Sequence, residues 1–145
     1  IDGKSMLSAM ILGADGVQMG TRFVACKESS AHESFKNLVL KAKEGDTKLT
    51  LKELTPVRML NNNFYNEIVQ LYQENASKEM LVNKLGKGRA KKGMFEGDLI
   101  NGELEIGQAS SQIREIHSAA QIINEIMSEY NKVKQQINIE SKFNF

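Results

Sequence analysis

The stretch of sequence best suited to chemistry is the segment Gly13–Phe23, GADGVQMGTRF. Apolar and polar residues alternate over Gly16–Gly20, which predicts a short buried strand that runs into a turn at Gly20 and Thr21. Such a turn leaves backbone N–H groups and a hydroxyl unpaired, and these groups can hold a phosphate at the carboxyl end of a parallel sheet. The alternative interpretation is a plain turn without a ligand.

No other group of side chains has the spacing of a catalytic or metal site. His32 and His117 lie far apart in the sequence, and each is interpreted as a structural or surface residue. Cys26 has no neighbouring base to activate it, so it is interpreted as an inert thiol. The sequence therefore predicts neither a catalytic residue nor a metal site within this chain.

Composition narrows the class of protein and its partners. The 145 residues are 41% hydrophobic and 26% charged, which is typical of a globular domain and excludes a disordered or fibrous protein. The 19 basic and 18 acidic side chains nearly cancel, so nucleic acid and anionic membranes are not expected as partners. A single cysteine and the lack of a membrane-length apolar run predict a cytoplasmic protein.

The elements around the turn indicate that more sheet exists than this chain supplies. A helix is expected over residues 4–12, with Gly13 as its C-terminal cap, directly before the predicted strand. A helix followed by a strand forms the second part of a βαβ unit, so the first strand of that unit would precede Ile1. Because the chain also opens on Asp2-Gly3 and not on a methionine, we expect it to be the C-terminal part of a larger protein.

The rest of the sequence predicts mainly helices. Four further segments are predicted to form helices, and each begins at residues that commonly cap helices. The last helix is interpreted as packing on the domain, in preference to binding a partner. The expected elements are a helix over 31–43 capped by Ser30, a strand or extended segment over 47–54, helices after Asn61–Asn63 and Ser77, an irregular glycine-rich segment over 86–107, and a helix over 118–137 that begins with a capping box of Ser118 and Gln121.

Several motifs are typical of one enzyme family. They are GADGVQMGTRF, KESSAH over residues 27–32, Pro56-Val57-Arg58, Gly93, EGD over 96–98, and Gly107-Gln108. Together they extend over nearly the whole chain, and the first two are the most specific. With these motifs the sequence resembles the nitronate monooxygenase family, formerly called 2-nitropropane dioxygenase, which includes the flavin-dependent enoyl-acyl-carrier-protein reductases.

The resemblance implies an α/β fold, the C-terminal portion of a TIM (β/α)8 barrel with a mainly helical extension. Residues 1–45 would form the end of the FMN-binding barrel, and residues 46–145 would form a mainly helical C-terminal region packed on it. The family's other phosphate loop and its histidine near the flavin ring have no counterpart here, so the N-terminal barrel half is expected to lie outside this chain. The residues implied in cofactor binding are Gln18, Met19, Gly20, Thr21 and Asp2, with Gln108 near the substrate.

The implied function is that of an FMN-dependent oxidoreductase acting on a small molecule, oxidising alkyl nitronates with O₂. An enoyl-acyl-carrier-protein reductase using NAD(P)H is the alternative within the family, and a noncatalytic helical interaction module is the alternative from another class. The chain alone is expected to be inactive and to bind FMN weakly, and a homodimer is left open. A peripheral position of the segment Gly16–Gly20 would count against the flavin assignment.

Overall fold

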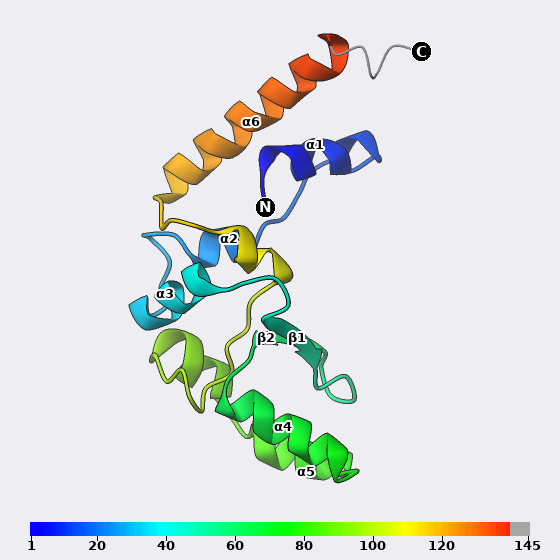
Figure 1. Cartoon of the computed structure of the whole chain (residues 1–145), viewed down its shortest axis with the longest axis vertical. Coiled ribbons are helices and arrows are strands. Elements are labelled where there is room, and N and C mark those ends of the chain that lie inside the picture. Colours follow the sequence, from blue (N-terminus) through cyan, green and yellow to red (C-terminus); the bar gives the residue numbers. More distant parts are fainter. Residues whose placement is uncertain (140–145) are drawn as a thin grey trace.

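The computed structural model describes residues 1–139, and it is an α/β chain with far more helix than strand. The elements are α1 (Gly3–Ile11), α2 (Thr21–Val24), α3 (Glu33–Lys41), β1 (Thr47–Thr50), β2 (Val57–Leu60), α4 (Asn63–Gln73), α5 (Lys78–Leu85), the π-helical turn η1 (Lys91–Phe95), the 3₁₀ turn η2 (Gln108–Gln112) and α6 (Ala119–Ile139). The chain runs from α1 at one end of an elongated, curved molecule to α4 and α5 at the other end, and then returns to α6 beside α1 (Figure 1).

The first and last helices lie side by side at one end of the molecule (Figure 1). Helix α1 begins after Asp2, whose Oδ1 accepts a hydrogen bond of 2.8 Å from the Ser5 N–H, and it ends before Gly13 at φ 99°. Helix α6 begins with the predicted capping box, in which the Gln121 N–H donates to Ser118 Oγ at 3.2 Å. These two helix predictions are confirmed, because local caps and apolar periodicity specify both elements.

The strand predicted over Gly16–Gly20 is wrong for this chain. Residues 16–19 form no regular element, and Val17, expected to be buried, is 39% exposed. A strand persists only where a neighbour pairs with its backbone, and no segment within residues 1–139 does so here. The segment therefore lies at the periphery of this chain, an outcome that by itself counts against a barrel strand.

The sheet consists of one antiparallel hairpin between β1 and β2, in which Thr47 lies opposite Leu60. Strand β1 falls within the extended segment predicted over 47–54, whereas β2 was not predicted. Strand β2 is four residues long and directly follows Pro56, so it shows too little alternation for its period to be recognised. A further segment runs beside β2, because the Leu60 N–H donates to the Leu104 carbonyl at 3.0 Å.

The middle helices begin at polar caps, one of them unexpected. Helices α4 and α5 start after Asn62 and Ser77, as predicted. Helix α3 starts after His32, whose Nδ1 accepts a 3.1 Å hydrogen bond from the Ser34 N–H, and the predicted cap at Ser30 is wrong. The imidazole nitrogen acts here as the acceptor that a capping hydroxyl or carboxylate normally supplies.

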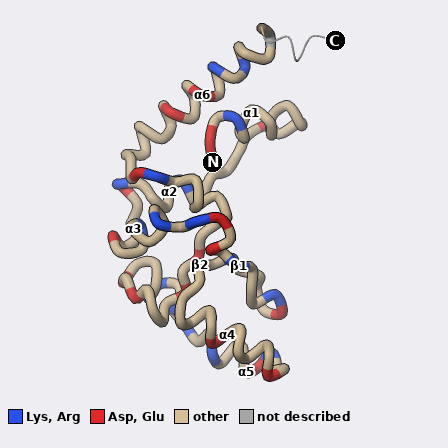
Figure 2. The backbone as a smooth tube through the Cα atoms, viewed as in Figure 1, with Lys and Arg blue, Asp and Glu red and all other residues tan. Residues whose placement is uncertain are grey.

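Three apolar clusters hold the elements together. The largest joins α3 to the segments before and after η2, around the fully buried Phe35 and Val39. A second joins the hairpin to α4 and α5, and a third joins α6 to Cys26, which is 4% exposed. Figure 2 shows acidic and basic residues interspersed along the chain, whose net charge is +1. None of the described helices is long and apolar enough to cross a membrane.

Candidate functional site

The predicted phosphate turn is exposed and leads directly into α2. The N–H groups of Phe23 and Val24 donate to the Gly20 carbonyl at 3.0 Å, which leaves the first-turn N–H groups of Thr21 and Arg22 without a partner inside the helix. Gly20 has a φ of −88°, and a side chain there would meet nothing within 4 Å. Neither the backbone nor the packing of this chain requires glycine at this position, so the turn has open space for a ligand.

The Thr21 side chain connects this turn to a distant part of the sequence. The Gly107 N–H donates a hydrogen bond of 3.1 Å to Thr21 Oγ1, across a sequence separation of 86 residues. The structure thereby brings the backbone of Gly107 to the turn, and the next residue, Gln108, begins η2 and is exposed. The turn and Gly107 belong to separate motifs, and their contact could not be derived from spacing.

The residues just before the turn face in different directions. Gln18 is exposed, whereas Met19 is partly buried and packs against the cluster formed by Cys26, Ile122 and Ile126. Met19 therefore anchors the segment on α6, and only its backbone remains available to a ligand. Gln18 is free to contact one through its side chain.

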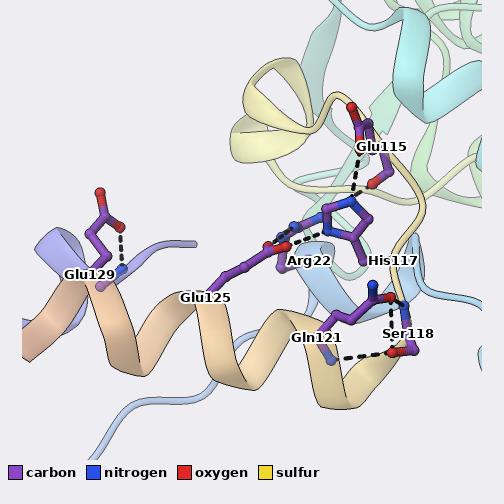
Figure 3. A network of polar contacts seen from close by, with 8 residues as sticks. Arg22, Glu115, His117, Ser118, Gln121, Glu125 and Glu129 are labelled. Carbon is purple, nitrogen blue, oxygen red and sulfur yellow. Dashed lines mark hydrogen bonds and ion pairs between the residues drawn. The ribbon is translucent and has the colours of Figure 1, made fainter.

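A polar network fixes the next residue, Arg22, away from the turn. Figure 3 shows its guanidinium on Glu125, with Nη2 3.0 Å from Oε2. His117 Nδ1 lies 2.6 Å from the other Glu125 oxygen, and Nε2 lies 2.8 Å from Glu115 Oε2. The Arg22 side chain is only 14% exposed, so it connects α2 to α6 and is not a free ligand for a phosphate. The same contacts support the structural role predicted for His117.

Asp2 and Gln108 lie in two different grooves. Asp2 lines a groove of about 1000 Å³ together with Arg22 and Glu129. Burial raises the pKa of Asp2, but hydrogen bonds from the Ser5 backbone and hydroxyl outweigh it and lower the pKa overall. Because this carboxylate is committed to capping α1, its oxygens are partly occupied. Gln108 lines a second groove with Lys43.

Sequence reasoning missed the network and the hydrogen bond that orders the turn. Arg22 and Glu125 are 103 residues apart, and neither belongs to a local pattern of charges. The sequence held one signal for the hydrogen bond, which is the presence of Gly107 in one of the family motifs. The structure explains this glycine, because Thr21 lies so close that a side chain at residue 107 would overlap it.

The fold and the turn together define an α/β chain with an exposed, ordered turn suited to a phosphate-bearing ligand. A family model described as nitronate monooxygenase matches residues 1–129. The chain belongs to the nitronate monooxygenase family, a group of flavin-dependent oxidoreductases.

Individual relatives agree with this assignment. The chain is 31% identical over 136 residues to a protein described as "Probable nitronate monooxygenase" from Staphylococcus aureus strain MSSA476, covering 93% of this chain and 38% of that protein. FabK from Thermotoga maritima matches with a TM-score of 0.85 and 36% identity, over 94% of this chain and 43% of FabK. Nitroalkane oxidase from Streptomyces ansochromogenes matches with a TM-score of 0.73 and 25% identity, over 94% of this chain and 38% of the oxidase. The chain thus spans less than half the length of these relatives.

Proposed function

We propose that this chain supplies the phosphate-binding turn of an FMN-dependent oxidoreductase that oxidises alkyl nitronates with O₂. The observation that carries the proposal is the hydrogen bond from the Gly107 N–H to Thr21 Oγ1, which orders a partly buried hydroxyl beside unpaired backbone N–H groups. Membership in a flavin-dependent family supports FMN as the phosphate-bearing group.

The residues of this chain would bind the cofactor and leave the electron transfer to it. The N–H groups after Gly20 and the Thr21 hydroxyl would hold the phosphate, with Gln18, the Met19 backbone and Asp2 close to the cofactor. When bound, FMN supplies the redox chemistry of the reaction. Gln108 would lie near the substrate, and no residue of this chain is assigned a proton transfer.

We also propose that Gly16–Gly20 becomes the eighth strand of a TIM barrel by pairing with polypeptide outside this chain. The match to less than half of each relative's length supports this arrangement. The apolar side chains around the segment support it too, because Ile11 is 66% exposed and Leu12 is 88% exposed. Residues 1–45 would then end the barrel, and residues 46–145 would form the region that packs on it.

A second candidate activity is reduction of an enoyl thioester by NAD(P)H. It is supported by the likeness to FabK, which at 36% identity is greater than the 25% identity to nitroalkane oxidase. The interaction module considered from the sequence receives no such support, because the matched relatives carry the names of enzymes.

Two assays on the full-length protein distinguish the activities. One measures O₂ consumption with an alkyl nitronate, and the other measures NADH or NADPH oxidation with an enoyl thioester. Protein stripped of FMN serves as the control in both. We expect FMN-dependent turnover of the nitronate; turnover of the thioester alone would replace the first activity with the second, and turnover of neither would refute both.

A further inference from the structure

The Gly107 N–H group, which donates a hydrogen bond to Thr21, lies in a rigid part of the fold. Just before Gly107, the Ile106 N–H donates to the Arg58 carbonyl of β2 at 3.1 Å. Ile106 is 6% exposed and Leu104 is fully buried, so hydrogen bonds and packing both fix this segment. The hairpin therefore determines where the Gly107 N–H lies, and its position does not depend on a flexible turn.

We propose that Gly107 is a positioning residue for the FMN phosphate and acts through the Thr21 hydroxyl. The inference rests on the proposed function, since it assumes that the turn binds FMN. A threonine hydroxyl has one proton to donate and two lone pairs to accept hydrogen bonds. The Gly107 N–H occupies one lone pair at 3.1 Å, so the hydroxyl proton is directed to a different acceptor. A phosphate oxygen at the turn is such an acceptor.

The same contact explains why residue 107 is a glycine. A Cβ atom there would lie 2.6 Å from Thr21 Oγ1 and 3.9 Å from Thr21 Cβ. The φ of Gly107 is −76°, which any residue can adopt, so the backbone conformation does not require glycine. An alanine would have to displace the hydroxyl or the peptide, and the hydrogen bond that orients the hydroxyl proton would be lost.

A double-mutant cycle in the full-length apoprotein tests this coupling. Dissociation constants are measured by flavin fluorescence for wild type, Thr21→Ala, Gly107→Ala and the double variant. Each is titrated with FMN and with riboflavin, which has no phosphate. Circular dichroism and thermal unfolding show whether each variant is folded.

We expect each single variant to raise the Kd for FMN about tenfold or more, as for the loss of a hydrogen bond to a charged group. The double variant should bind FMN as Thr21→Ala does, because without the hydroxyl the new Cβ atom displaces nothing. The Kd for riboflavin should change less than about twofold throughout. Thr21→Ser, which retains the hydroxyl, should bind FMN within about threefold of wild type.

Different outcomes refute the inference and the proposed function. Three results for Gly107→Ala would refute the positioning role while the FMN site stands. The Kd for FMN could stay unchanged, or the Kd for riboflavin could rise as much as the Kd for FMN. The substitution could also raise the Kd for FMN as much in the Thr21→Ala background as in wild type. If Thr21→Ala has no effect, or wild type does not bind FMN, the proposed phosphate turn fails and the inference fails with it.

A second measurement leaves Gly107 unchanged and remains decisive if its variant does not fold. The amide resonance of Gly107 is followed by NMR during titration with FMN in wild type, Thr21→Ser and Thr21→Ala. We expect the resonance to shift where residue 21 carries a hydroxyl and to stay unchanged with alanine. Equal shifts in all three proteins would refute the coupling.

Discussion

At the scale of single residues, Glu103 carries a buried carboxyl group outside the candidate site whose pKa is raised well above its ordinary value. It is 7% exposed, and burial, assisted by the nearby Glu105, raises its pKa to about 7, while Arg89 opposes the shift. The folded chain therefore retains a proton on this group at pH values where the unfolded chain has released it. This proton makes the stability of the chain depend on pH.

The free energy of unfolding should fall as the pH rises from 5 to 8. The contribution of Glu103 is fully present below its unfolded pKa near 4.5 and is lost as the pH rises through its folded value of about 7. We expect a loss on the order of 1 to 3 kcal/mol in urea titrations, and much less in Glu103→Gln. Glu44→Gln, at an exposed position, is the control. A pH slope in Glu103→Gln equal to that of wild type would contradict this assignment.

Glu125 should stabilise the fold through Arg22 and His117, the two groups that share its carboxylate. Glu125→Ala leaves the largely buried Arg22 without its carboxylate partner, so we expect the free energy of unfolding to fall by about 1 to 3 kcal/mol. Glu115 is the matched control, because its side chain contacts His117 alone and is 74% exposed. Equal effects of alanine at positions 115 and 125 in denaturant titrations would contradict this account.

At the scale of elements, the sequence predicts helices far better than strands. Helices α4, α5 and α6 carry their own caps and apolar periodicity, so about ten neighbouring residues specify each. Strands need partners, and the segment Gly16–Gly20 has none among the described residues. The turn that follows it was recognised from its motif, but the contact with Gly107 depends on the hairpin, which no local pattern of residues predicts.

The contact between α1 and α6 depends on the absence of a side chain at Gly3. A Cβ atom there would overlap the backbone of α6 at Ile126 and Tyr130. Alanine normally stabilises a helix relative to glycine by about 1 kcal/mol. Gly3→Ala should nevertheless destabilise the chain by about 1 to 3 kcal/mol, because the two helices must separate.

Gly16→Ala is the matched control for this helix contact, since a Cβ atom at residue 16 meets nothing within 4 Å in this chain. The thermal unfolding of both variants, made in the chain of 145 residues, compares them directly. A Gly3→Ala variant at least as stable as wild type would show that α1 does not pack on α6 as closely as described.

At the scale of the whole molecule, apolar side chains are exposed on the first and last helices, α1 and α6. Ile11 and Leu12 are exposed at the end of α1, and Ile123 and Met127 are 51% and 40% exposed on α6. The turn at Gly20 and Thr21 is proposed to hold only the phosphate of FMN, so the flavin ring would need contacts from further polypeptide. Both points favour the proposal that the chain works within a longer polypeptide.

The isolated chain should therefore bind FMN at least about 100-fold more weakly than the full-length protein, a difference of about 3 kcal/mol. Fluorescence titration of both proteins under the same conditions measures the ratio. An isolated chain that binds one FMN as tightly as the full-length protein would show that the site is complete without further sequence.

The visible absorption spectrum of the full-length protein, after reconstitution with FMN and removal of unbound flavin, tests the central claim most directly. The account predicts a yellow protein with flavin absorption bands at one FMN per polypeptide. A folded but colourless protein would contradict it, because the turn at Gly20 and Thr21 would then have no flavin phosphate to bind.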